Sequence, residues 1–102
     1  MRLSAFEVDA IRKSFIKHFG AESHLWLFGS RVDDNKRGGD IDLYMQTTES
    51  DTKKLVQSRI RFLTDLDSRL GEQKIDLVIH QIHLKTELPI YSVAQKTGIL
   101  LV

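Results

Sequence analysis

The sequence predicts an α/β (α+β) domain, with a small mixed β-sheet and helices packed mainly on one face. Three observations predict it. Apolar residues recur at helical spacing in three segments, short apolar runs typical of strands lie between them, and a glycine follows each helical segment. A chain of 102 residues buries about two thirds of its unfolded surface, so residues 1–102 are expected to form a single domain with a modest core.

The first helix is predicted from Ser4, which forms a capping box with Glu7, to the glycine stop at Gly20. Its apolar face is expected to hold Val8, Ile11, Phe15 and Phe19. Residues 24–28 are short, apolar and bounded by Gly29, a pattern that favours a buried strand leading into a turn.

Residues 32–39 are polar and are expected to form a loop, after which Ile41, Leu43 and Met45 alternate with Asp40 and Asp42. This alternation predicts a strand with one face in the core and carboxylates on the other. A polar connection, 47–52, precedes the second helix, which ends at Gly71. The apolar positions expected to mark that helix are Val56, Ile60, Leu63, Leu66 and Leu70.

The third strand is predicted over 74–79, with Ile75, Leu77 and Ile79 on one side. Asp76, Val78 and His80 then share the other side. Pro89 suits the first position of a helix that runs to Gly98, and the apolar run 99–102 is expected to add a strand or to pack under the helices.

Composition excludes several classes of protein. No apolar run approaches the roughly 20 residues of a membrane helix, and no signal peptide is expected at the amino terminus. A formal charge of +1 gives no field for direct nucleic-acid binding, which disfavours a processive polymerase. The absence of cysteine excludes thiolate metal sites and is compatible with a cytoplasmic location.

Two neighbouring patterns predict a phosphate and metal site. Gly29 and Ser30 end an apolar run, where a sharp turn exposes backbone N–H groups and a hydroxyl to an anion. Asp40 and Asp42 lie about 6.6 Å apart on one face of a strand, where a hard cation such as Mg²⁺ or Mn²⁺ relieves their repulsion. Asp76 interrupts an apolar strand, and three carboxylates converge if that strand lies beside Asp40 and Asp42.

Other residues near this site have two interpretations. Arg31 either binds a phosphate oxygen or pairs with Asp33 or Asp34. Tyr44 shares the carboxylate face and either borders the nucleotide or covers the rim of the site. Trp26 and Phe28 are expected in the core rather than in base stacking. His80 and His83 have no cysteine partners, so a zinc site is disfavoured and surface or supporting roles are expected.

The pattern Gly29-Ser30-Arg31, a long gap and Asp40-Ile41-Asp42-Leu43, with Asp76 on a later strand, resembles the DNA polymerase beta-like nucleotidyltransferase superfamily. Within it, the chain looks like the minimal nucleotidyltransferases that act as antitoxins beside HEPN-family toxins. The resemblance covers nearly the whole chain. It implies catalytic and metal-binding roles for Asp40, Asp42 and Asp76, and nucleotide-binding roles for Gly29, Ser30 and Arg31.

The activity implied by the resemblance is the transfer of AMP from ATP, with two Mg²⁺ ions, to a HEPN-type toxin partner. Gly39 stands where the family usually has a serine, and Asp34 where a loop glycine is common. These departures keep open a binding antitoxin that neutralises its partner by occlusion. A small-molecule acceptor fits less well, because one domain leaves no second lobe to form an acceptor pocket. The sequence leaves a homo-oligomer open.

Overall fold

The computed structural model describes residues 3–20, 22–29, 32 and 40–102. The helices and strands follow one another in the order that the sequence predicts. They are, in order, α1 (Ala5–Phe19), β1 (His24–Phe28), β2 (Ile41–Thr47), α2 (Thr52–Leu70), β3 (Ile75–Gln81), α3 (Pro89–Thr97) and β4 (Ile99–Leu100). The mixed α+β class is therefore confirmed.

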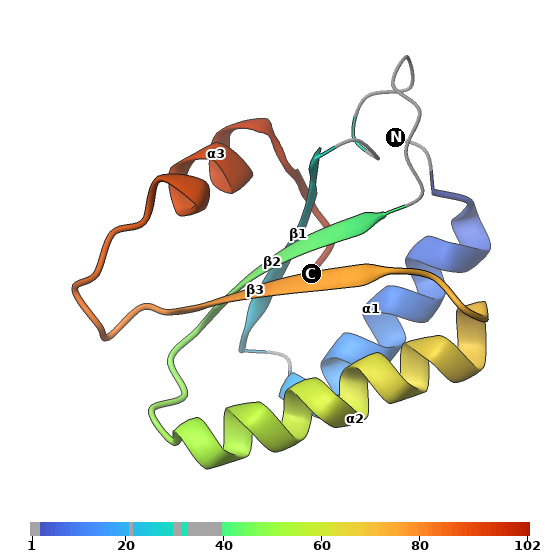
Figure 1. Ribbon diagram of the computed structural model, residues 1–102, viewed down its shortest axis with the longest axis horizontal. Coiled ribbons are helices and arrows are strands. Elements are labelled where there is room, and N and C mark those ends of the chain that lie inside the picture. Colours follow the sequence, from blue (N-terminus) through green and yellow to red (C-terminus); the bar gives the residue numbers. More distant parts are fainter. Residues whose placement is uncertain (1–2, 21, 30–31, 33–39) are drawn as a thin grey trace.

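The four strands form one mixed sheet in the order β3-β2-β1-β4 (Figure 1). Strand β1 pairs antiparallel with both β2 and β4, whereas β2 and β3 are parallel. A parallel pair needs a crossover connection, and α2 supplies it. The short β4 shows that the terminal apolar run adds a strand at the edge of the sheet.

Side-chain hydrogen bonds at their first turns explain where α1 and α2 begin. The Ser4 hydroxyl accepts the Glu7 N–H at 3.1 Å, and the Glu7 carboxylate accepts the Ser4 N–H at 3.0 Å, so the predicted capping box is confirmed. At the start of α2, the Asp51 carboxylate accepts the N–H groups of Lys53 and Lys54. These bonds satisfy N–H groups that have no acceptor within their own helix.

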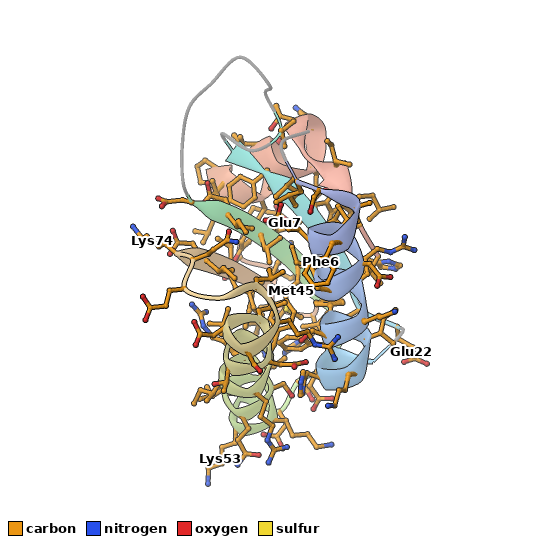
Figure 2. The ribbon with its side chains drawn as sticks, turned by 90° about the vertical axis from the view of Figure 1, so that its right-hand side faces the viewer. Phe6, Glu7, Glu22, Met45, Lys53 and Lys74 are labelled. Atoms are coloured by element: carbon orange, nitrogen blue, oxygen red, sulfur yellow. The ribbon has the colours of Figure 1, made fainter. Side chains whose placement is uncertain are left out.

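Helices α1 and α2 cover one face of the sheet and enclose the main core (Figure 1). Phe62 of α2 contacts Phe15 and Phe19 of α1 edge to face, with ring centroids 5.8 and 5.6 Å apart. Met45 points from β2 toward these helices (Figure 2). The core on this face includes the fully buried side chains of Ile11, Phe15, Leu25, Leu27, Ile41, Leu43, Met45, Phe62 and Leu66.

The buried face of α2 differs from the predicted one. Leu66 is buried as expected, but Val56 and Ile60 are 51% and 60% exposed, and Leu55 and Phe62 take their place. Apolar residues on this helix span more than one face, and the large Phe62 ring gains most from burial between the other two phenylalanines. Burying that ring turns Val56 and Ile60 outward.

Helix α3 lies on the opposite face of the sheet, over a second core cluster of Phe28, Tyr44, Tyr91 and Ala94. Trp26 packs against this cluster, so the expectation that Trp26 and Phe28 are core residues is confirmed. Two helices cover one face and one covers part of the other. None of the helices within the described ranges is long and apolar enough to cross a membrane.

Candidate active site

Gly29 directly follows β1 and has a backbone conformation that residues with side chains rarely adopt, with φ of +78°. Its neighbour Phe28 pairs with Asp42 across β1 and β2. A Cβ atom at position 29 would collide with Oδ2 of Asp42. Both the positive φ and the close approach of the carboxylate therefore require glycine here.

Asp42 and Asp76 are direct partners across the parallel pair of β2 and β3. Successive side chains on a strand alternate between faces, so both carboxylates lie on the face that α3 partly covers, away from α1 and α2. The predicted division of the third strand is confirmed, since Leu77 belongs to the main core and Val78 packs on the α3 side. The third strand does lie beside the strand of Asp42, which was the condition for Asp76 to approach it.

Asp40 lies one residue before β2, beside the start of β3. The N–H of Ile41 donates to the carbonyl of Lys74 at 2.9 Å, which brings the two strand ends together. The Lys74 ammonium then lies 3.7 Å from Oδ2 of Asp40, and the two side chains are 68% and 49% exposed. Figure 2 shows Lys74 projecting outward from the sheet. The sequence analysis did not predict this cation, because its contact with Asp40 depends on the register of two strands far apart in the chain.

The charge distribution acts most strongly on Asp42. Its partial burial raises the pKa of the carboxyl, and the charges of Asp76 and then Asp40 raise it further. The Lys74 ammonium opposes these effects. The two other carboxylates are therefore close enough to Asp42 to repel its charged form, and a bound cation would relieve this repulsion.

The chemistry of these donors fits a hard divalent cation. Carboxylate oxygens are the ligands that Mg²⁺ and Mn²⁺ prefer. Within the described residues, no group of three or more His, Cys, Asp or Glu side chains is gathered closely enough to hold a metal ion. Asp42 and Asp76 form a direct cross-strand pair, and Asp40 lies beside Lys74 at the start of the same two strands.

Several residues of the predicted site lie outside the described residues. They are Ser30 and Arg31, expected to bind nucleotide, and Asp33, Asp34 and Gly39 of the following loop. Of the residues predicted to bind phosphate, the structure therefore describes only Gly29.

A polar network around the buried side chains of Tyr44 and His80 was not predicted. The side-chain amides of Gln46 and Gln95 each donate to the Tyr44 hydroxyl oxygen at 3.0 Å, so the hydroxyl donates its own hydrogen to His80 Nδ1 at 2.6 Å. The His80 ring also stacks on Tyr91, with centroids 3.8 Å apart.

This network settles the roles left open for two residues. Tyr44 lies on the carboxylate face, as predicted, but its side chain has no exposed surface, so it borders neither a nucleotide nor a rim. His80 is buried and hydrogen-bonded rather than on the surface. Together they join β2, β3 and α3 and hold the helix over the sheet.

Comparison with known proteins adds no family to this description. A scan against protein-family models gives no match, and no curated protein matches the chain.

Proposed function

We propose that this domain is a metal-dependent nucleotidyltransferase, which transfers AMP from ATP to a partner protein of the HEPN toxin type. The observation that carries the proposal is the direct cross-strand pairing of Asp42 with Asp76, with the Gly29 backbone against the Asp42 carboxylate. In this proposal, the turn at Gly29 binds phosphate oxygens and the carboxylate pair binds metal. The reaction needs both, because it brings a triphosphate and divalent ions together.

In the proposed reaction, a hydroxyl of the partner attacks the α-phosphorus of ATP, a new P–O bond forms, and pyrophosphate leaves. Bound Mg²⁺ would supply charge neutralisation on the phosphates and activation of the attacking hydroxyl. Asp40, Asp42 and Asp76 would hold the ions, and Asp76 is the residue proposed to accept the hydroxyl proton. Gly29 and Ser30 would bind the β and γ oxygens, with Arg31 as an added phosphate contact.

The acceptor hydroxyl must come from another molecule. A lone domain of this size offers little surface to enclose and orient an acceptor, and orientation contributes much of the rate enhancement in transfer reactions. Val93 of α3 is 50% exposed and Leu100 of β4 is 58% exposed. These apolar side chains lie in the segment 89–102, which we propose as a contact surface for the partner.

The test is to co-express the domain with its genomic neighbour, purify the complex, and measure the mass of the partner. We expect one or more added AMP masses with the wild-type domain and none with Asp40→Asn/Asp42→Asn. Asp67→Asn, an exposed aspartate on α2, is the matched control and should leave the added mass in place. Added mass with the double variant would refute the assigned carboxylates.

A second function is a binding antitoxin that neutralises its partner by occlusion. It is favoured by the ion pair of Lys74 with Asp40, because a protein cation already balances one of the carboxylates assigned to metal. A tight complex without added mass, formed in the presence of ATP and Mg²⁺, would support occlusion. If no complex forms, both versions of the antitoxin proposal fail.

A further inference from the structure

A polar cavity of about 350 Å³ lies at the other end of the domain from Asp42. Its walls come from the end of α1, the end of β2 and the first half of α2. Thr47, which lines the cavity, is the last residue of β2, whereas Asp42 lies near the start of that strand. The start of α2, which borders the cavity, and the start of β3, beside the carboxylates, lie on opposite sides of the molecule along its longest axis (Figure 1). The volume is within the usual range of about 300–1,000 Å³ for small-molecule sites.

Two cations line this cavity. Lys54 and Arg61 lie seven positions apart on α2, which brings them to the same side of the helix two turns apart. In the part of the chain that the structure describes, neither side chain forms an ion pair. A guanidinium presents a planar fork that matches the oxygens of a phosphate, and a nearby ammonium adds a second charge-assisted bond.

The acidic residue in the wall, Glu49, only partly offsets these charges. Its Oε1 accepts the backbone N–H of Asp51 at 3.2 Å. His18 also lines the cavity, and its Nε2 lies 3.2 Å from Oδ2 of Asp65, which fixes the ring. The charge balance of Lys54, Arg61 and Glu49 favours an anion.

The remaining wall suits an organic group attached to that anion. Phe19 and Leu55 give an apolar surface, and both belong to the helices that enclose the main core. Thr47 and Ser58 add hydroxyls beside it. The Thr47 oxygen already accepts from the Ser23 hydroxyl and the Glu49 N–H, which leaves its own hydrogen as a donor.

We propose that this cavity binds a small organic phosphomonoester, with its phosphate between Lys54 and Arg61 and its body against Phe19 and Leu55. The proposal is independent of the proposed transferase activity, because it uses no residue of the carboxylate site. Inorganic phosphate would bind the same two cations. The test therefore compares the affinity of inorganic phosphate with that of a phosphate ester.

The experiment is an amide NMR titration of the whole chain with ribose 5-phosphate and, separately, with inorganic phosphate. Both are added at millimolar concentrations without divalent ions. The carboxylates around Asp42 then repel the phosphate, because no metal ion bridges them to it. We expect saturable shifts at Leu55, Ser58 and Arg61, small shifts at Asp42 and Asp76, and tighter binding of the ester. Equal affinities would overturn the assigned organic body, and absence of shifts at the cavity would overturn the site.

Matched variants on the same helix sharpen this test. Lys54→Gln and Arg61→Gln should each raise the dissociation constant about tenfold, the effect of losing one charge-assisted hydrogen bond. The controls Lys53→Gln and Arg59→Gln remove neighbouring charges outside the cavity wall and should have little effect. Glu49→Gln should tighten binding, since it removes the opposing charge. Equal losses in the variants and their controls would reduce the effect to net charge and overturn the proposal.

Discussion

Asp42 and Asp76 are direct partners across two parallel strands, and both lie on the face of the sheet that α3 covers only in part. Like charges in such positions destabilise a sheet. Burial, Asp76 and Asp40 together raise the pKa of Asp42, so the fold without metal bears a cost for keeping this carboxyl ionised. Residues that weaken a fold in this way are typical of functional sites.

Asp42→Asn should therefore stabilise the metal-free protein, and under the proposed function it should also abolish nucleotidyl transfer. We expect the free energy of unfolding in urea to rise by about 0.2–1 kcal/mol, the range for cross-strand charge pairs. Asp67→Asn, which lies on α2, should change neither quantity. Retention of Mg²⁺-dependent transfer in Asp42→Asn would sink the catalytic assignment.

The stabilisation by Asp42→Asn should depend on pH. The folded protein holds the Asp42 proton above the ordinary pKa of 3.8, where the unfolded chain has lost it. The contribution of this group to stability therefore falls as pH rises above that value. Urea unfolding should show the variant and wild type converging at and below about pH 4 and separating above it. Separation only at acidic pH would contradict the raised pKa.

Gly29→Ala should impair both the fold and the site. An L-residue at positive φ costs about 1–2 kcal/mol, and the new methyl group would also displace the Asp42 carboxylate. Gly71→Ala is a matched control, because Gly71 has the same φ of +78° with open space around its Cβ position. Both variants should lose similar stability through the backbone, whereas only Gly29→Ala should weaken Mg²⁺ and nucleotide binding in calorimetric titration. Equal Mg²⁺ and nucleotide binding by the two variants would show that Gly29 is not part of the site.

Tyr44→Phe should destabilise the domain by about 1–3 kcal/mol, because it leaves His80 Nδ1 and two amide groups without their partner. Urea unfolding measures the loss. Tyr91→Phe also removes a tyrosine hydroxyl but keeps the ring that stacks on His80, and it should cost less. Similar losses in both variants would show that the hydrogen bonds of Tyr44 contribute little.

Asp65→Asn should weaken the contact between α1 and α2. The Asp65 carboxylate accepts the Ser14 hydroxyl at 2.7 Å and Arg69 Nε–H at 3.0 Å, and the Ser14 bond is the largest cause that lowers the pKa of Asp65 to about 2. We expect a loss of about 1–3 kcal/mol at neutral pH. Because the folded pKa lies below the ordinary 3.8, this contribution is present above that pH and is lost as pH falls toward 2. The gap between wild type and variant in urea unfolding should close over this range, and a constant gap would refute the role of the charge.

Local patterns in the sequence predict much of the fold. The capping box at Ser4, the alternation around Asp42 and the proline at the start of α3 are each decided by neighbouring residues, and the structure confirms all three. The pairing of Asp42 with Asp76 also follows, once the two strands are placed side by side with their apolar positions on one face.

Other features depend on contacts between distant segments, which local patterns do not encode. The rotation of α2 is decided by Phe62 meeting Phe15 and Phe19 of another helix, so Val56 and Ile60 were wrongly expected in the core. Lys74 reaches Asp40 only through the register of β2 and β3, and Tyr44 meets Gln95 only when α3 folds back over the sheet.

The crossover through α2 also determines when Asp42 and Asp76 come together during folding. Strands β1 and β2 follow one another in the chain and pair antiparallel, so Gly29 and Asp42 can meet early, whereas Asp76 arrives only after the whole of α2. Such long-range pairings are slow, because chain closure precedes any gain from contact. A chain still emerging from the ribosome therefore lacks the repulsion between Asp42 and Asp76, which arises only when β3 pairs with β2.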